Sequence, residues 1–214
     1  MMKKIFLIVT LLVLGMVNMS YADEVSVGIG ASKFTSSDGI WYQDEFPHSL
    51  RLTSFSAKIQ YEKTISEKFA LNGGYLYLGK TSSDAEASAS DADHSWPLSH
   101  WYGYGDVKGA YLQGKYTLGS GIYLQGGGYF YKATWHEYIP DWRPCATCDT
   151  MYVEVSHKPK WKLAPIYGIG YRHKNMSIEM MQTWVNGDED TVNGNNFNAL
   201  YTKSTTSVYI NYYY

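Results

Sequence analysis

Apolar and polar residues alternate in short segments along most of the chain. The last eight residues, SVYINYYY, place Val208, Ile210, Tyr212 and Tyr214 on one face and a more polar set on the other. A period of two is typical of β-strands, and each segment is close to the ~9–11 residues that cross a bilayer at a tilt. The pattern predicts eight strands, at residues 25–33, 53–62, 69–80, 108–118, 122–133, 163–172, 176–182 and 207–214.

The connections between these segments alternate in length. Long connections are expected at residues 34–51, 81–106, 134–161 and 184–204, and short ones at residues 62–68, 119–121 and 173–175. With an even number of strands, both ends of the chain would lie on the side of the short turns. Outer-membrane barrels show this asymmetry. A soluble β-sandwich, the alternative for so many strands, has no reason to sort its loops by length.

The first 22 residues have the features of a secretory signal peptide. Lys3 and Lys4 precede a mostly apolar run at residues 5–16, and Ser-Tyr-Ala at residues 20–22 offers a cleavage site between small residues. The apolar run is too short for a good membrane span, which argues against the alternative of an uncleaved anchor helix. We therefore expect a signal peptide at residues 1–22 and one barrel domain at residues 23–214.

Composition argues against two other classes of protein. Hydrophobic residues make up 45% of the 214 residues, but no second segment approaches the ~20 apolar residues of a transmembrane helix. Without Lys3 and Lys4, the chain has 16 basic and 20 acidic side chains. This mildly acidic balance gives no electrostatic reason to bind nucleic acid.

Charged residues within the predicted strands lie opposite the apolar faces. They are Lys58, Lys80, Lys115, Arg172 and Glu179. Isolated charges are costly next to hydrocarbon, but inside a barrel they can pair with one another. Because an eight-stranded barrel is only wide enough for its own side chains, we expect these five residues to form a polar network that plugs the interior.

Several of these features together resemble the small OmpA/OmpX-type outer-membrane β-barrel family. The stretch APIYGIGYRHKNMSIEM, residues 164–180, is similar to the sixth strand, tight turn and seventh strand of that family. The final stretch is similar to its C-terminal assembly signal, with Tyr212 and Tyr214 at the aromatic positions, although Tyr209 stands where that signal often has glycine. The resemblance implies an all-β, eight-stranded antiparallel up-and-down transmembrane barrel with four long outer loops and three short periplasmic turns.

The same resemblance carries expectations about location and partners. It implies the outer membrane of a Gram-negative bacterium, contact with outer-membrane lipid and lipopolysaccharide, and recognition by the barrel-insertion machinery during assembly. We expect a monomer, and a host-surface ligand is a candidate partner of the outer loops. In the family such loops serve adhesion, colonisation, serum resistance or envelope integrity.

All seven tryptophans lie in or beside the predicted long loops. An interfacial aromatic girdle is the interpretation we assign to Trp135, Trp161 and Trp184. The other four lie deeper in the loops, and since tryptophan is enriched in binding hot spots, they are candidates for surface contact. These four are Trp41, Trp96, Trp101 and Trp142.

Two cysteines, Cys145 and Cys148, stand in the sequence PCATC within the third long loop. An envelope protein matures under oxidising conditions, so we expect this pair to close a disulfide. A redox site would need a helix N-terminus, and a zinc site would need closer histidines, so both alternatives are weaker. We predict no metal and no cofactor.

An enzyme is the main functional alternative, because some eight-stranded barrels modify lipid A. His173, Ser177 and Glu179 contain the groups of a hydrolase triad. Alternation, however, places Ser177 and Glu179 inward and His173 on the other phase. We therefore predict a barrel with no catalytic residues that displays its loops for adhesion, colonisation or envelope protection; a lipid A deacylase or acyltransferase and a narrow channel are the alternatives.

Overall fold

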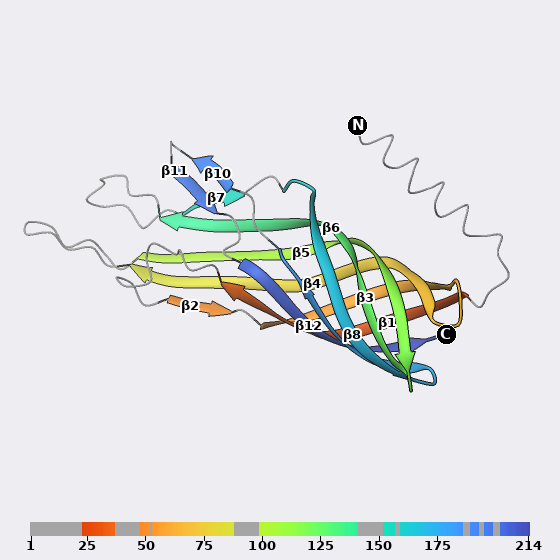
Figure 1. Ribbon diagram of the computed structural model, residues 1–214. Helices are drawn as coiled ribbons and strands as arrows, with labels where there is room; N and C mark the ends of the chain where they lie inside the picture. The colour runs from red at the N-terminus through yellow and green to blue at the C-terminus, as the bar shows by residue number, and fades with distance from the viewer. Residues whose placement is uncertain are drawn as a thin grey trace, which may run out of the picture.

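The computed structural model describes residues 23–36, 48–51, 53–87, 99–140, 152–156, 159–185, 189–192, 195–198 and 202–214. Among these residues, no helix is long and apolar enough to cross a membrane. Eight long strands dominate the structure, most of which are labelled in Figure 1. They are β1 (Asp23–Ser36), β3 (Thr53–Thr64), β4 (Phe69–Ala87), β5 (Ser99–Gly119), β6 (Ile122–Pro140), β8 (Lys162–His173), β9 (Met176–Thr183) and β12 (Thr202–Tyr213).

These eight strands close into an antiparallel barrel. Each strand pairs with the next long strand along the chain, and β4 also pairs with β5, in the order β4-β3-β1-β12-β9-β8-β6-β5. The first and last strands complete the circle, with Ile29 opposite Ile210. The predicted eight-stranded up-and-down barrel is therefore confirmed, and hydrogen bonding between the two ends of the chain leaves the barrel without a free edge.

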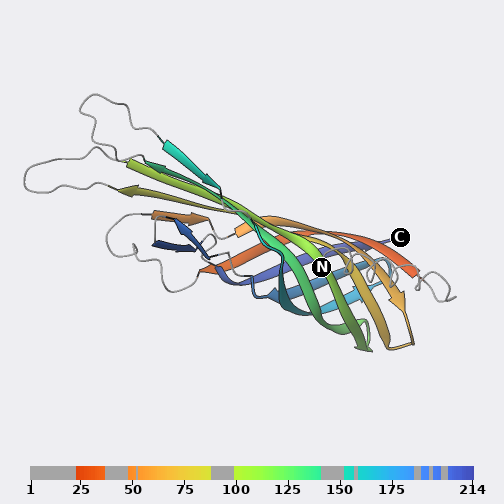
Figure 2. The ribbon, with the colours of Figure 1, turned by 90° about the horizontal axis from the view of Figure 1, so that it is seen from above.

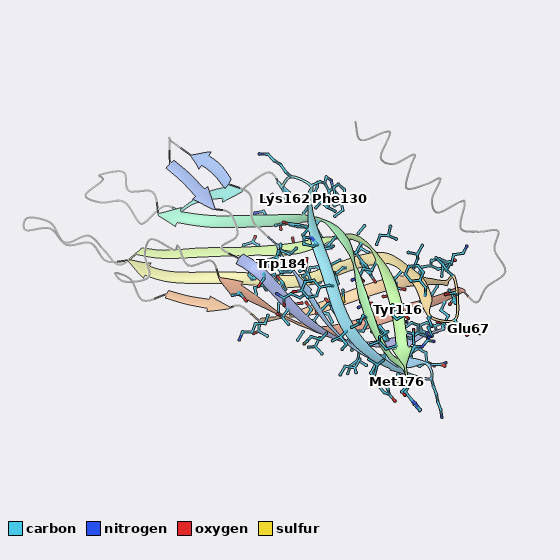
Figure 3. The ribbon with its side chains drawn as sticks, viewed as in Figure 1. Glu67, Tyr116, Phe130, Lys162, Met176 and Trp184 are labelled. Carbon is cyan, nitrogen blue, oxygen red and sulfur yellow. The ribbon has the colours of Figure 1, made fainter. Side chains whose placement is uncertain are left out.

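The barrel wall has an apolar outside and a filled inside. Along β12, the outward side chain of Ile210 is 52% exposed, whereas the inward side chain of Asn211 is fully buried. The same alternation runs around the wall, as the side chains in Figure 3 illustrate. Exposed apolar residues of this outer belt include Val27, Ile29, Phe55, Ile59, Tyr75, Leu112, Tyr116, Leu124, Phe130, Tyr167, Ile169, Ile178, Met180 and Val208.

The two ends of the barrel differ. At one end, short turns join β3 to β4, β5 to β6 and β8 to β9. At the other end, β4, β5 and β6 continue beyond the barrel as a projecting sheet (Figures 1 and 2). Two short strands widen this sheet, because β2 (His48–Arg51) pairs with β4 and β7 (Tyr152–Ser156) pairs with β6. A separate hairpin is formed by β10 (Glu189–Val192) and β11 (Asn195–Asn198).

The projecting sheet corrects the predicted extent of the long loops. Pairing between β4 and β5 continues without a break from Lys80 opposite Asp106 to Ala87 opposite Ser99, within a segment expected to be a loop. Likewise, β6 continues to Pro140. These strands gave no alternating signal because a ribbon that projects beyond a barrel no longer has one face against lipid and the other against a core.

A β-bulge in β4 corrects the prediction for Lys80. The pairing register shifts between Tyr77 and Gly79, and Gly79 has a φ of +106°. Leu78 still points inward, in phase with Leu76, but the side chain of Lys80 is exposed on the outside of the wall. An extra residue in one strand changes the face of every residue after it, so Lys80 does not belong to the interior network.

Candidate functional site

The interior near the centre of the barrel contains a buried ion pair between β3 and β9. The ammonium of Lys58 donates to the carboxylate of Glu179, and both side chains are fully buried. Glu179 also accepts hydrogen bonds from the hydroxyl of Tyr123 at 2.6 Å and from the amide of Gln125 at 3.3 Å. Several donors thus share one carboxylate, which is the arrangement that a buried charge requires.

Two further ion pairs lie between this centre and the short-turn end. Lys115 donates to both oxygens of Glu62, at 2.8 and 2.9 Å, and Arg172 binds Glu24 with two bonds of 2.5 and 2.7 Å. The pairs are linked, because one guanidinium nitrogen of Arg172 lies 3.9 Å from Glu62. Three cations therefore face three carboxylates in this part of the barrel, so the network carries no net charge.

Tyrosine rings fill the space between these ion pairs. The guanidinium of Arg172 lies 3.9 Å from the ring centre of Tyr213, and the ammonium of Lys115 lies 4.3 Å from that of Tyr123. Cations in such positions are attracted to the ring face. Ser177 is hydrogen-bonded to Asn211 at 2.8 Å in the same layer.

Sequence reasoning missed Glu24 and Glu62. Glu62 was assigned partly to a turn, and Glu24 precedes the first predicted strand by one residue. The signal was nevertheless present, because Glu62 has the same strand phase as Lys58, and Glu24 has the same phase as the inward-facing Ser26. Reading the alternation to the last residue of the predicted strand at 53–62 would have found Glu62, and extending the first strand by one residue would have found Glu24.

The interior toward the projecting sheet is largely apolar and carries no ion pair among the described residues, so the charged network fills only part of the barrel. Buried side chains from most of the strands pack together there. Uncharged hydroxyl groups lie among them: Ser32 and Ser207 are hydrogen-bonded to each other at 2.7 Å, and the hydroxyl of Tyr129 donates to the backbone carbonyl of Leu76 at 3.1 Å. The cluster comprises Phe34, Leu76, Leu78, Val107, Tyr111, Tyr129, Tyr131, Ala133, Ala164, Ile166, Met181, Val185 and Tyr209.

Tyr111 marks the boundary between the two layers. Its ring belongs to the apolar cluster, while its hydroxyl donates to Gln60 at 2.9 Å. Gln60 also accepts a hydrogen bond from Lys58 at 3.1 Å. The interior is therefore continuous, with a polar layer that passes directly into an apolar one.

The residues proposed for a hydrolase triad do not form one. Inside the barrel, Glu179 forms an ion pair with Lys58. Ser177 is hydrogen-bonded to Asn211 and Tyr213. His173 has an exposed side chain at the short-turn end of β8. Within the described segments, no group of three or more His, Cys, Asp or Glu residues could hold a metal ion.

Only part of the aromatic and cysteine predictions falls on described residues. Trp41, Trp96, Trp142, Cys145 and Cys148 lie outside them. The backbone of Trp101 lies in β5, opposite Ala85 in the projecting sheet, and not in a loop; its side chain is also outside the described part.

The aromatic residues at the C-terminus face outward. Tyr212 and Tyr214 are 47% and 76% exposed, and their rings meet edge to face with 5.0 Å between centres. They therefore lie on the outer surface at the short-turn end.

Two of the expected girdle tryptophans border the outer belt on the side of the projecting sheet. Trp161 stacks on Phe130 with 4.7 Å between ring centres, and Trp184 lies 5.2 Å from the ring of Tyr167. Figure 3 shows Phe130 and Trp184 toward this end of the barrel, and Tyr116 and Met176 toward the short turns. The belt is thus bounded by amphipathic rings, which settle at the level of lipid headgroups.

Solved structures with the same architecture are outer-membrane barrels. The chain is similar to Ail, the attachment invasion locus protein of Yersinia pestis, with a TM-score of 0.53 and 11% identity over 90% of this chain and 97% of that one. Neisserial surface protein A gives a TM-score of 0.43 with 11% identity, covering 89% and 95% of the two chains. The outer membrane protein OprG of Pseudomonas aeruginosa gives 0.43 with 12% identity, covering 90% and 95%.

No protein-family model matches the chain, and no curated protein resembles it in sequence. The structural similarity therefore establishes the fold: the chain has the closed eight-stranded architecture of small outer-membrane barrels of the OmpA/OmpX type.

Proposed function

We propose that the protein is a non-catalytic outer-membrane β-barrel that presents a projecting sheet and its loops for contact at the cell surface. The outer belt is the observation that carries the membrane placement. Apolar side chains such as Ile29, Phe55 and Ile178 are more than half exposed on the outside of the wall, and they would be unfavourable in water. Lipid is the solvent in which this surface is stable.

The filled interior argues against a role in transport. Polar and apolar layers occupy the barrel in series, and the ion pairs of the polar layer satisfy one another. The same packing argues against a lipid-binding cavity of the kind that a lipid A acyltransferase would need. Mass spectrometry of lipid A from deletion and overexpression cells should therefore show unchanged acylation.

The projecting sheet supports a role in surface contact. Its strands follow the order β2-β4-β5-β6-β7, and β2 and β7 are short, so much of the backbone along each edge has no described partner strand. Unpaired edges are sites where other chains can add a strand. Such a surface is suited to adhesion, colonisation or envelope protection, and a host-surface ligand is the expected partner.

Assembly and surroundings complete the proposal. We expect contact with outer-membrane lipid and lipopolysaccharide along the belt, delivery by the barrel-insertion machinery through Tyr212 and Tyr214, and a monomeric state. Expression in a Gram-negative host should place the chain in the outer-membrane fraction. Gel mobility should change on boiling, because a folded barrel migrates differently until heated. Recovery as a dissolved monomer without detergent would contradict the membrane placement.

The contact role is tested with the tryptophans assigned to it. Replacing Trp96, Trp101 and Trp142 with alanine should reduce binding of expressing cells to host cells or matrix, with the heat-dependent gel shift retained. Trp184→Ala is the matched control, because Trp184 packs on Tyr167 beside the belt, and it should leave binding unchanged. Full binding by the triple variant would argue against these rings as the contact surface.

A further inference from the structure

Three lysines form a patch on the outer face of adjacent strands, just beyond the apolar belt. Lys132 and Lys108 are directly opposite each other on β6 and β5, and Lys80 is opposite Asp106 on β4 and β5. The next outward pair toward the short turns is Ala110 opposite Phe130, which belongs to the belt. The lysine patch, defined as Lys80, Lys108 and Lys132, therefore borders the apolar surface.

The bulge at Gly79 is what completes this patch. Without the shift of register between Tyr77 and Gly79, Lys80 would point into the barrel. With it, the lysine is exposed beside Asp106 and Lys108. The same local feature that removes a charge from the interior adds one to the outer face.

The charges of the patch are not balanced within the described residues. Asp106 is the acidic partner there, and its carboxylate is already bound by the ammonium of Lys108 at 2.9 Å and by the hydroxyl of Thr134. Lys132 lies over the ring of Trp161, 4.9 Å from its centre. Like charges directly opposite each other on neighbouring strands are destabilising, so the Lys108 and Lys132 pair favours an anion between or beside them.

The surroundings of the patch indicate which anion it is suited to. Trp161 joins the two surfaces, because its ring contacts Lys132 on one side and stacks on Phe130 of the belt. Nearby, Leu163 is 75% exposed. A ligand that covers both surfaces needs an anionic group attached to acyl chains, which is the chemistry of a phosphorylated lipid headgroup and not of a soluble anion.

We propose that the lysine patch binds the phosphate groups of a lipid A-type glycolipid, whose acyl chains lie along the belt. This inference rests on the proposed membrane placement and names one site for the expected contact with lipopolysaccharide. Ammonium groups bind phosphate as compact point charges, and the patch lies on the same end of the barrel as the projecting sheet. The bound lipid would therefore be in the outer leaflet.

The test uses the barrel refolded in zwitterionic detergent and titrated with diphosphoryl lipid A, with bound lipid counted by native mass spectrometry. Lys108→Gln together with Lys132→Gln should weaken binding by about tenfold, since each basic residue near a charged lipid surface contributes substantially to attraction. Lipid A with its phosphates removed should bind equally to the original protein and to this variant.

Two further variants separate the site from general charge. Lys68→Gln with Lys174→Gln removes two exposed lysines at the short-turn end and should leave the affinity within about twofold of the original, since charges separated by more than a Debye length are largely screened. Lys108→Arg with Lys132→Arg keeps the charge and should retain binding. Equal losses in the two glutamine variants, or no loss in either, would overturn the proposal.

A measurement on the unmodified protein covers the case in which the glutamine variant does not fold. Diphosphoryl lipid A should slow the labelling of Lys108 and Lys132 by an amine-reactive reagent, whereas dephosphorylated lipid A should not. Unprotected lysines would count against the site. Failure of the membrane placement itself would be seen earlier, because such a protein would show no heat-dependent gel shift and would not require detergent.

Discussion

The two halves of the barrel interior are filled by opposite means. Toward the short turns, three ion pairs hold one another in a layer that carries no net charge, with Lys58 and Glu179 as the most buried pair. Toward the projecting sheet, Leu76, Leu78 and Ile166 pack with tyrosine rings, as in the core of a soluble protein. The comparison shows that a barrel in lipid can have a lumen that is polar at one end and apolar at the other.

The difference predicts how each half responds to substitution. In the polar layer, stability depends on partners, because a charge left alone in a buried site is costly. In the apolar layer, stability depends on volume, because a removed side chain leaves a cavity. A variant that removes a charge partner therefore tests the polar layer, and a variant that reduces side-chain volume tests the apolar layer.

The largest effect is expected from breaking the central ion pair. Glu179→Gln leaves the buried ammonium of Lys58 without its carboxylate, and we expect the free energy of unfolding to fall by about 4 kcal/mol. Urea-induced unfolding in lipid vesicles, followed by tryptophan fluorescence, measures the change. Lys58→Met combined with Glu179→Gln should recover most of the loss, because no unpaired charge remains. A double variant no more stable than Glu179→Gln would show that pairing is not what the polar layer requires.

A smaller effect is expected in the apolar layer. Leu78→Ala should lower the free energy of unfolding by about 3 kcal/mol through loss of contacts and the cavity left behind. Leu124→Ala is the matched control, since Leu124 is 45% exposed on the lipid-facing side and should show a much smaller loss in the same assay. Similar losses at the two positions would contradict a packed apolar interior.

The bulge in β4 changes which side chains face the inside and which the outside of the barrel, and it depends on Gly79. A Cβ atom at Gly79 would lie 2.4 Å from both the carbonyl oxygen of Phe55 and the hydroxyl oxygen of Ser54, and its φ of +106° disfavours other residues. Gly79→Ala should therefore cost about 2 kcal/mol. Gly119 also has a positive φ, but a Cβ atom there would meet no atom within 4 Å, so Gly119→Ala should lower the free energy of unfolding by less. An equal loss for the two variants would argue against close packing at the bulge.

The sequence predicted the barrel because its strongest constraints are periodic. Alternation in segments such as residues 207–214 predicted the strands. Short turns at every second connection predicted that neighbouring strands are antiparallel. Phase alone also assigned Lys58, Lys115, Arg172 and Glu179 to the same side of their strands, and the structure places all four in the network.

Other features of the interior could not be predicted in this way. Lys80 was misplaced because a single extra residue changes the phase, and one glycine among many is a weak signal for a bulge. The apolar layer was missed because leucine and tyrosine occur on both faces of the strands: Leu76 is buried while Leu124 is exposed. Only the depth of a residue along the barrel distinguishes the two layers, and depth depends on the tertiary register.

The smallest effect is expected for ion conductance, where the two halves act in series. Glu62→Gln with Lys115→Gln removes one ion pair of the polar layer, yet planar-bilayer conductance should stay negligible because the apolar layer still excludes water and ions. Adding Leu78→Ser and Val107→Ser would introduce polar groups into that second layer, and any conductance should arise only in this combined variant. Steady channels in the first variant would show that the polar layer alone closes the barrel, and the apolar residues would then contribute to stability without acting as a barrier.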